Sequence, residues 1–487
     1  MFRQQSGMPV PENSLLLENN FLLFEKALLI FVSSYKPILS KDISLALRLS
    51  FFVTKICHQE TKKEIMAFQN TLKFAKALDR KDPLKKFRAR FLFPKHKGKE
   101  VIYFTGNSLG LQPKSVEKYI KQALHDWAKF GVEGHFKGKN PWFSYHEILA
   151  EPLSKIVGAK PNEVVAMNQL TSNIHFLFVS FYRPTKTRYK ILCEEKAFPS
   201  DQYAIESQVK FHNHDPADAI IEVAPRAGEH TIRHEDIVST IEKNKNELAL
   251  VFLGGVNYYS GQVFNIKSIT EEARKSGIVV GFDLAHAAGN IKMNLHEWNV
   301  DFAAWCSYKY LNSFAGSVGG AFINEKHHNQ SLPMFAGWWG YNKEKRFQMQ
   351  KGFVPIPTAE AWQVSNAPVL SMAAHKASLD IFMEVGIDRL VEKSKSLTGY
   401  LEFIIEEINK NVEYKNEKVE IITPKEHRGC QLSLIAHGHG KELFNKLTEQ
   451  GVICDWREPN VFRCAPVPLY NSFEDVYRFG EILKRYL

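Results

Sequence analysis

The feature that most constrains this chain is a series of short apolar runs, rich in β-branched residues and separated by helical patterns. The runs are continuous rather than alternating, which is typical of strands buried on both faces of a sheet. They lie at Tyr189–Cys193, Ala219–Val223, Leu248–Leu253, Ile278–Phe282, Phe302–Cys306 and Val318–Ile323. Helical patterns separate several of them, as at Ile232–Lys243 and Ile266–Lys275. The sequence therefore predicts an α/β fold with a large, doubly wound, mostly parallel sheet.

The sequence after Pro368 has a different pattern of predicted helices and strands. Two long helical patterns, at 369–385 and 388–410, precede several short apolar runs and a closing helix after Ser472. The runs lie at Val419–Ile422, Gln431–Ile435 and Val452–Asp455. This mixture predicts a smaller α+β C-terminal domain over 369–487. We assign the rest of the chain to a large domain at 99–368, an N-terminal helical segment at 66–98 and an N-terminal extension outside the core fold at 1–65.

Residues 14–57 are rich in Leu, Phe and Ile, which raises the question of a membrane segment. Glu25 and Lys26 interrupt the run, and no uncharged stretch reaches the roughly 18–20 residues that span a bilayer. No small-residue cleavage site follows cleanly, so a secretory signal fits poorly. We predict no membrane helix. The extension is either dispensable to the fold or a helical hairpin packed on its surface.

Charge and cysteine content narrow the classes of function. The 487 residues include 63 Lys and Arg against 53 Asp and Glu, a net charge of +10 without any block of like charges. A dispersed basic excess favours an anionic small ligand and disfavours a nucleic-acid partner. The six cysteines are scattered and form no CxxC pair, which predicts free thiols, a cytoplasmic protein and no metal site.

Polar side chains follow three of the predicted strands. Phe198 and Asp201 come after the first run, Asp283 and His286 after the fourth, and Lys309 after the fifth. Because ligands gather at the carboxyl ends of strands in open α/β sheets, we expect these side chains to converge on one rim. An acid, an aromatic ring and a lysine in one place suit a site for pyridoxal phosphate.

Each residue type meets a chemical need of this cofactor. A lysine amine forms the resting Schiff base, for which Lys309 is the candidate. A carboxylate keeps the pyridine nitrogen protonated, which suits Asp283, and a flat apolar partner stacks on the ring, which suits Phe198. The phosphate needs hydroxyls and the backbone N–H groups of a helix start, which Leu170 and Thr171 offer before an apolar helix.

Two segments, Gly281–His286 and Trp305–Tyr310, resemble the kynureninase family, which has fold type I of the pyridoxal-phosphate enzymes, the aspartate-aminotransferase-like fold. Phe198–Ser207, Gly337–Gly340 and Arg463–Asn471 also look specific to that family, and the resemblance covers 66–487. It implies a hydrolase that cleaves the Cβ–Cγ bond of L-kynurenine or 3-hydroxy-L-kynurenine to anthranilate or 3-hydroxyanthranilate plus L-alanine. It further implies pyridoxal phosphate as cofactor, a homodimer, and a role in tryptophan catabolism and NAD biosynthesis.

By this resemblance, Lys309 is the catalytic residue that forms the Schiff base and shuttles the α-proton. The implied cofactor-binding residues are Leu170, Thr171, Phe198, Ser200, Asp201, Tyr259, Asp283, His286, Tyr308, Lys309, Asn366 and, from the partner subunit in the family, Trp338. The implied substrate-binding residues are Ser108, His135, Ser365, Asn366 and Arg463, of which Arg463 clamps the α-carboxylate. His135, Ser365 and Asn366 resemble the pocket of relatives that favour the 3-hydroxy substrate, so we predict that preference. Gly254 departs from the family, because relatives often carry a serine there.

Other classes of enzyme stay open on the sequence. An aminotransferase or a cysteine desulfurase would share the fold, although Cys306 and Cys430 are poorly placed for the mobile nucleophile of a desulfurase. Gly106–Gly110 also matches the G-x-S-x-G nucleophile elbow, which makes a serine hydrolase using Ser108 possible. That elbow would lie on about the first strand, and no HGGG-type oxyanion segment precedes it. The favoured interpretation is a glycine-rich turn at the edge of a pocket.

Overall fold

The computed structural model describes residues 67–412 and 418–487. Contacts between residues divide the chain into two units, Met1–Ala67 and Phe68–Leu487, and the fold described below belongs to the second unit. The extension predicted at 1–65 lies outside the described residues. Among the helices of the described part, none is both long and apolar enough to cross a membrane.

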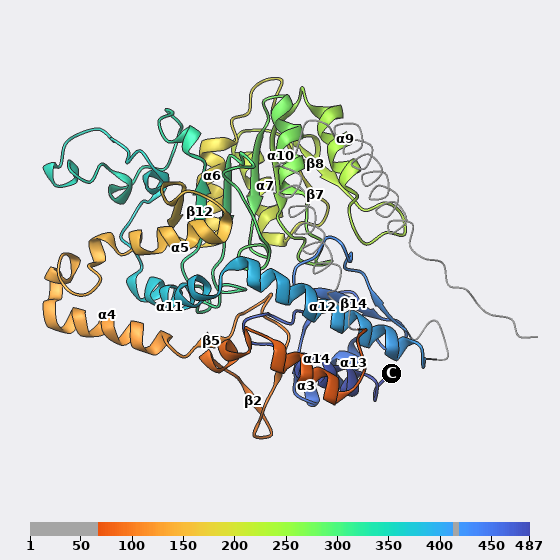
Figure 1. Ribbon diagram of the computed structural model, residues 1–487. Helices are drawn as coiled ribbons and strands as arrows, with labels where there is room; N and C mark the ends of the chain where they lie inside the picture. The colour runs from red at the N-terminus through yellow and green to blue at the C-terminus, as the bar shows by residue number, and fades with distance from the viewer. Residues whose placement is uncertain (1–66, 413–417) are drawn as a thin grey trace, which may run out of the picture. The chain divides into compact units, whose positions relative to one another are not determined.

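A seven-stranded sheet forms the centre of the fold (Figure 1). From one edge to the other it contains β6 (Val164–Ala166), β12 (Gly320–Ile323), β11 (Phe302–Trp305), β10 (Val279–Asp283), β9 (Leu248–Gly254), β7 (Lys190–Glu194) and β8 (Ile220–Val223). The five strands from β11 to β8 are parallel, which confirms the predicted mostly parallel sheet. By contrast, β12 runs antiparallel to both of its neighbours. No helix lies between β11 and β12, and a parallel return would require a crossover connection.

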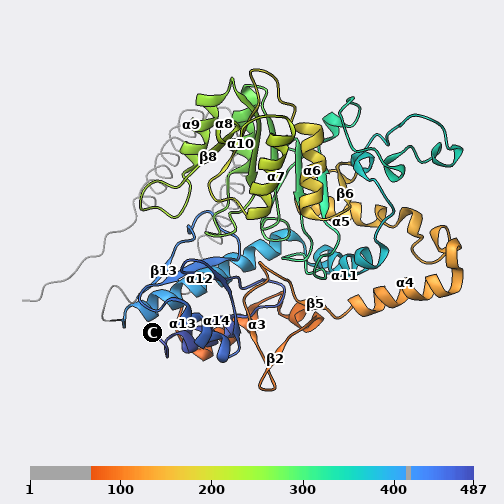
Figure 2. The same cartoon turned by 180° about the vertical axis from the view of Figure 1, so that it is seen from behind.

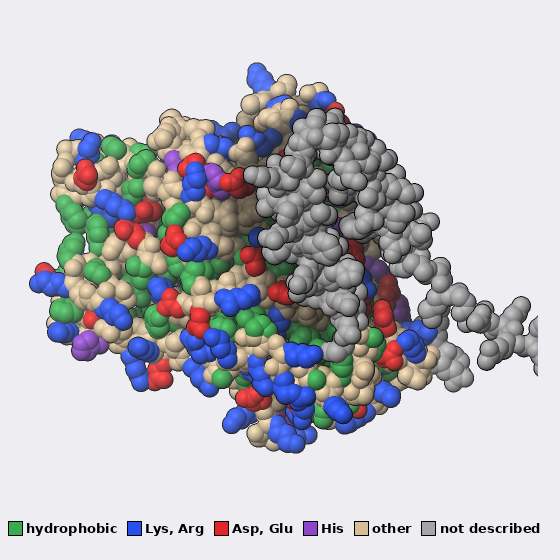
Figure 3. All heavy atoms as spheres, in the orientation of Figure 1, with side chains coloured by type: hydrophobic (Ala, Val, Ile, Leu, Met, Phe, Trp, Pro, Cys, Tyr) green, Lys and Arg blue, Asp and Glu red, His purple; other side chains and the backbone are tan. Residues whose placement is uncertain are grey.

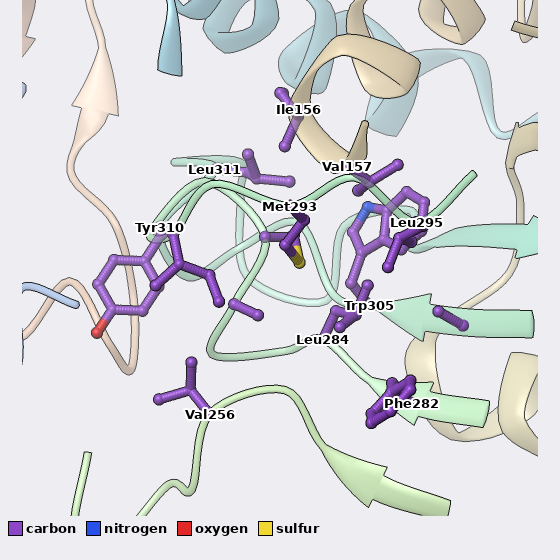
Figure 4. Packing of buried hydrophobic residues seen from close by; sticks show 14 of the residues in the cluster. Ile156, Val157, Val256, Phe282, Leu284, Met293, Leu295, Trp305, Tyr310 and Leu311 are labelled. Atoms are coloured by element: carbon purple, nitrogen blue, oxygen red, sulfur yellow. The ribbon is translucent and has the colours of Figure 1, made fainter. Parts of the chain in front are cut away.

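Helices cover both faces of this sheet. Successive strand residues point to opposite faces, so Phe302 and Ala303 of β11 pack in two different hydrophobic clusters. One cluster draws on α6 (Leu170–Phe181) and α7 (Pro199–Phe211). The other draws on α5 (Glu147–Val157), α9 (His234–Asn244), α10 (Ile266–Lys275) and α11 (Val369–Val385). Figure 4 shows Val157, Leu295 and Trp305 within this second cluster.

The C-terminal part of the chain forms a four-stranded antiparallel sheet. Its order is β13 (Val419–Ile421), β14 (Leu432–Ala436), β17 (Val461–Cys464) and β16 (Asp455–Arg457). With this sheet, α12 (Ile387–Asn409), α13 (Gly440–Glu449) and α14 (Phe473–Leu483) enclose a third hydrophobic core. The predicted helices at 369–385 and 388–410 are confirmed as α11 and α12. Gly386, with φ of 80°, separates them, a backbone conformation that glycine adopts without strain.

The first described helix contributes to this third core. α3 (Leu72–Lys81) packs against α14, and Figure 2 shows the two helices side by side. Phe74 of α3 lies in the same hydrophobic cluster as Phe479 of α14. Asp79 of α3 accepts a hydrogen bond of 2.8 Å from the backbone N–H of Phe473, where α14 begins. The N-terminal helical segment is therefore held by the last helix of the chain.

The next segment also joins the C-terminal core. The chain after residue 98 forms two short strands, β3 (Lys99–Glu100) and β4 (Ile102–Tyr103). β4 pairs in parallel with β15 (Val452–Ile453), and Phe104 is fully buried in the third core. Near the sheet, α4 (Val116–Phe130) packs along α11. The segment that precedes the strands of the large sheet in the sequence thus packs in the C-terminal core.

Candidate active site

A cavity of about 250 Å³ lies at the carboxyl ends of β7, β9 and β10 and at the N-terminus of α6. Its lining includes nine predicted residues: Leu170, Thr171, Phe198, Ser200, Asp201, Asp283, His286, Tyr308 and Lys309. The sheet brings them together because neighbouring parallel strands end at the same edge, so residues distant in the sequence reach one cavity.

Lys309 and His286 meet inside this cavity. Lys309 Nζ lies 2.9 Å from His286 Nε2 and 5.7 Å from the centre of the Phe198 ring. Burial, reinforced by the charge of Lys309, lowers the pKa of His286 well below its usual value. The imidazole is therefore neutral, and its Nε2 accepts a hydrogen bond from the lysine ammonium. Among the described residues, His286 Nδ1 is buried without a hydrogen-bond partner.

Three buried carboxyl groups line the same cavity. Asp283 Oδ1 accepts a hydrogen bond of 2.7 Å from the backbone N–H of Ala285. Burial, and then the charge of Asp283, raises the pKa of Asp201 well above its usual value. Burial also raises the pKa of Glu194 to about 7. The N–H of Gly254 donates a hydrogen bond of 3.0 Å to Glu194 Oε2, which lowers that pKa but does not offset the effect of burial. Asp201 and Glu194 therefore hold their protons more tightly than ordinary carboxyl groups do.

The N-terminus of α6 borders the cavity as well. No side chain caps this helix, which begins at Leu170 after Gln169. Leu170 and Thr171 line the cavity, so the backbone N–H groups of the first turn and the Thr171 hydroxyl can bind a ligand there. Helix N-termini bind phosphate groups through these N–H groups and the helix dipole. An anionic end of a ligand fits here.

Several lining residues are absent from the predicted set: Gln169, Glu194, Val256 and Tyr258. Glu194 is the last residue of β7, one position beyond the predicted end of that strand, so the strand-end argument would have reached it with a longer strand. Gly254 lines the cavity next to it, and a Cβ at this position would lie 3.3 Å from Glu194 Oε1. Tyr258 reaches this cavity, whereas its predicted neighbour Tyr259 lines an adjacent one.

Arg463 of β17 contacts the lining residue Tyr258 from the side of the C-terminal sheet. Its guanidinium is fully buried, and Nη1 donates a hydrogen bond of 2.6 Å to the Tyr258 carbonyl. Nη2 donates to Ser108 Oγ at 3.1 Å and also pairs with the carboxylate of Asp455. The structure thus brings together Arg463 and Ser108, two of the residues predicted to bind substrate.

The remaining predicted residues do not line the cavity. Ser365 and Asn366 are exposed. His135 and Trp338 lie in an aromatic cluster that we define as His135, Phe136, Phe143, Trp338 and Phe347. In this aromatic cluster the ring centres of Phe136 and Phe347 are 6.4 Å apart, and those of Trp338 and Phe347 are 5.5 Å apart. One copy of the chain therefore leaves His135, Trp338, Ser365 and Asn366 outside the Lys309 cavity.

The cavity fits pyridoxal phosphate. Lys309 offers an amine, Asp283 a carboxylate for the pyridine nitrogen, and the ring of Phe198, which is 40% exposed, a surface for stacking. Asp201 Oδ1 and His286 Nδ1 are buried and unpartnered among the described residues, so both have hydrogen-bonding capacity for a polar ligand. The fold and this cavity define a fold-type-I pyridoxal-phosphate enzyme.

Comparison with known proteins gives the family. Residues 390–483 match the family model described as the kynureninase C-terminal domain. The chain is 61% identical to the kynureninase of Flavobacterium psychrophilum, over 86% of this chain and 99% of that protein. It is 49% identical to the kynureninase of Nematostella vectensis, over 84% of this chain and 92% of that protein. The chain belongs to the kynureninase family.

Solved structures show the same fold at much lower sequence identity. A cysteine desulfurase from Escherichia coli matches with a TM-score of 0.67 at 14% identity, over 83% of this chain and 98% of that chain. A cysteine desulfurase from Thermococcus onnurineus matches with a TM-score of 0.65 at 16% identity, over 79% of this chain and 94% of that chain. These likenesses confirm the predicted fold class.

The structure does not favour a cysteine desulfurase or a serine hydrolase. Cys306 and Cys430 are buried, and burial raises the pKa of both thiols, that of Cys430 to about 12, so neither is an activated nucleophile. Ser108 interacts with Asp455 and Arg463, and no described hydrogen bond joins it to a histidine. The serine therefore lacks the general base that a serine hydrolase requires.

Proposed function

We propose that this chain hydrolyses the Cβ–Cγ bond of L-kynurenine and 3-hydroxy-L-kynurenine, giving anthranilate or 3-hydroxyanthranilate plus L-alanine. The observation that carries the proposal is Lys309 beside three buried carboxyl groups, in a chain 61% identical to a kynureninase over 86% of this chain and 99% of that protein. The reaction would serve tryptophan catabolism and NAD biosynthesis.

Bound pyridoxal phosphate supplies an electron sink for the charge that develops on the substrate. Lys309 Nζ takes the α-proton, and His286 orients this amine by accepting a hydrogen bond from it over 2.9 Å. The N–H of Ala285 fixes the Asp283 carboxylate, which would keep the pyridine nitrogen of the bound cofactor protonated. Addition of water to the γ-carbonyl and cleavage of its bond to Cβ then release the aromatic acid.

Arg463 is the candidate for binding the α-carboxylate of the substrate. Its planar guanidinium can hold a carboxylate through two parallel hydrogen bonds. Its contact with the Tyr258 carbonyl places it against the wall of the Lys309 cavity. A carboxylate bound there would fix the Cα–H bond relative to Lys309, which is what α-proton removal requires.

Replacement of Lys309 tests the proposal. The Lys309→Ala variant should lose the visible absorbance of lysine-bound pyridoxal phosphate and the anthranilate fluorescence that appears when kynurenine is added. Lys292→Ala is a matched control, since Lys292 is half-exposed and pairs with Asp388. Anthranilate production by Lys309→Ala at the wild-type rate, or a wild-type protein that stays colourless with added cofactor, would refute the proposed function.

We further propose a cytoplasmic homodimer. Large apolar side chains that are 39–77% exposed gather on α4, on the loop after it, on 335–370 and on nearby loops. These residues are Leu92, Leu109, Leu124, Trp127, Val132, Phe136, Phe314, Phe335, Trp338, Phe347, Met349, Val354 and Leu370. Figure 3 shows hydrophobic side chains on the side of the molecule that carries α4 and α11. Such a surface is typical of a protein interface. Equilibrium sedimentation should give twice the chain mass.

The same resemblance supports a preference for the 3-hydroxy substrate. His135, Ser365 and Asn366 match the pocket of relatives that favour it, and a second copy of the chain would have to bring them to the cavity. Comparison of kcat/KM for the two substrates tests this preference, and an equal or higher value for kynurenine would contradict it.

A further inference from the structure

The arginine proposed to bind the substrate carboxylate is already paired with a carboxylate of the chain itself. Arg463 is fully buried, and its Nη2 contacts Asp455, whose side chain is 11% exposed. Register explains the pairing, because Asp455 of β16 lies directly opposite Arg463 of β17 in the antiparallel sheet. Arg463 Nε is buried and, among the described residues, has no hydrogen-bond partner. The Arg463 guanidinium is therefore paired with the Asp455 carboxylate, and its Nε–H donor has no partner among the described residues.

Asp455 has a second cation within reach. Arg457 Nη2 donates to Asp455 Oδ2 at 3.2 Å, and the Arg457 side chain is 36% exposed. The hydroxyl of Ser108 also donates to Asp455. The same carboxylate oxygen thus accepts from a buried arginine, a partly exposed arginine and a serine. Asp455 can move away from Arg463 and still keep an ionic partner.

A substrate carboxylate that reaches Arg463 meets the negative charge of Asp455. Two carboxylates held close together in a buried site repel each other strongly, so they do not share one guanidinium at full charge. We propose that Asp455 occupies the carboxylate site of Arg463 in the free enzyme and is displaced by the substrate α-carboxylate, with Arg457 retaining the displaced Asp455. This inference rests on the proposed function, in which Arg463 binds that carboxylate.

The exchange makes Asp455 a specificity residue. A ligand with a carboxylate replaces one ion pair at Arg463 by another, so its binding leaves the buried charge compensated. The decarboxylated amine of the substrate cannot make this exchange and leaves Asp455 in place. Asp455 thereby excludes amines that lack the α-carboxylate from the productive arrangement.

Substitution of Asp455 by asparagine tests the exchange. The amide keeps the shape and a hydrogen-bond acceptor for Arg463 but removes the competing charge. The dissociation constant of the product L-alanine, measured by calorimetry on the holoenzyme, should fall about tenfold, and KM should fall more than kcat changes. Glu402→Gln is a matched control, because Glu402 pairs with the buried Arg428 at 2.7 Å and neither residue lines the Lys309 cavity. Weaker or unchanged L-alanine binding in Asp455→Asn would overturn the proposal.

A double-mutant cycle separates the exchange from simple through-space attraction. Arg457→Gln removes the second partner of Asp455, so L-alanine should bind about tenfold more weakly. In the Asp455→Asn background the same Arg457→Gln change should have almost no effect, because no displaced carboxylate needs a partner. Equal effects of Arg457→Gln in both backgrounds would contradict the exchange. If Asp455→Asn does not fold, the single variant Arg457→Gln still tests the proposal. Unchanged L-alanine binding in Arg457→Gln would overturn it.

Failure of the proposed function would give a different result. If Arg463→Gln binds L-alanine as tightly as the wild type, Arg463 does not hold the carboxylate, and the proposed placement of the substrate falls. If Arg463→Gln weakens binding while Asp455→Asn also weakens it or leaves it unchanged, the placement stands and only the displacement of Asp455 is refuted.

Discussion

The Lys309 cavity and the aromatic cluster differ in how far a single chain buries their residues. The Lys309 cavity lies at the ends of β7, β9 and β10, and its ionisable residues Glu194, Asp201, Asp283 and His286 are buried. Residues of the aromatic cluster stand on connections without long helices or strands, and Phe136, Trp338 and Phe347 are 42–57% exposed. The strand ends and the start of α6 assemble the first region, whereas the second presents its rings to solvent.

This contrast separates two tasks in the proposed enzyme. The cofactor and the proton that leaves the substrate are managed by groups that the parallel sheet fixes relative to one another. Recognition of the aromatic part of the substrate is assigned, by resemblance, to His135, Ser365 and Asn366, which one copy of the chain leaves outside the cavity. In the proposed homodimer, one chain would supply the groups that remove the proton, and the second copy would complete recognition of the aromatic ring.

The largest effect should come from the Lys309 cavity. Asp283→Asn keeps the shape of the side chain but removes the charge that holds the pyridine nitrogen protonated, so kcat/KM should fall by about a thousandfold. Steady-state anthranilate fluorescence measures the loss. Asp380→Asn serves as a control outside the cavity, since Asp380 interacts with Tyr119 and Lys376 on α4 and α11. A fall of less than about tenfold in Asp283→Asn would mean that the sheet-built region does not govern the chemistry.

Mixing two inactive variants tests the aromatic cluster. We expect Trp338→Ala to lose most activity because the partner subunit would supply this ring to the cavity. Equal amounts of Trp338→Ala and Asp283→Asn, unfolded and refolded together, should recover about a quarter of the wild-type activity, because random pairing leaves about one site in four intact. No recovery, with dimers present by sedimentation, would place Trp338 in the site of its own chain.

A smaller effect is expected on stability rather than activity. Burial raises the pKa of Glu194 from 4.5 to about 7, so the folded protein binds more protons than the unfolded chain between these values. The free energy of unfolding should therefore fall as the pH rises from 4.5 through about 7. Glu194→Gln removes this dependence, and its stability relative to wild type should rise by about 3 kcal/mol across that window.

Urea unfolding of the apoproteins at several pH values measures this change. Glu344→Gln is the control, because Glu344 is exposed and should give a flat difference. A wild-type protein that gains stability relative to Glu194→Gln as the pH rises would show that Glu194 is charged in the folded state.

The smallest effect should follow from Gly254→Ser. A Cβ at this position lies 3.3 Å from Glu194 Oε1, a contact that a small shift of the carboxyl group relieves. The new hydroxyl can donate to Glu194, so the dissociation constant of pyridoxal phosphate should change by less than about threefold. Fluorescence titration of the apoprotein measures it. A loss of more than about thirtyfold would show that the Lys309 cavity tolerates no added side chain there.

Much of the Lys309 cavity follows from the sequence for a simple reason. Apolar runs fix which segments become strands, and a parallel sheet then places the residue after each strand at a common edge. Asp283 and Lys309 are therefore predictable as neighbours, although they follow different strands. Glu194 escapes the prediction because the charged residue itself closes β7, where an apolar pattern gives no sign that the strand continues.

The pairing of Asp455 with Arg463 is not predictable in this way. The sequence predicts one strand at Val452–Asp455, whereas the structure has β15 and then β16, a short strand of mixed polarity. Only the register of β16 against β17 places the two charges together. Likewise, the periodicity of α3 predicts a helix but not its contact with α14, because that contact joins opposite ends of the described chain.

The contact of α3 and β4 with the C-terminal core also has a consequence for biosynthesis. Phe74 and Phe104 are made early, but α14 and β15, which bury and pair this segment, leave the ribosome last. The early segment must therefore stay unpaired, with apolar side chains open to chaperones, until translation ends. A fragment that begins at residue 369 should fold poorly for the matching reason, since it would lack the aromatic rings that complete its own core.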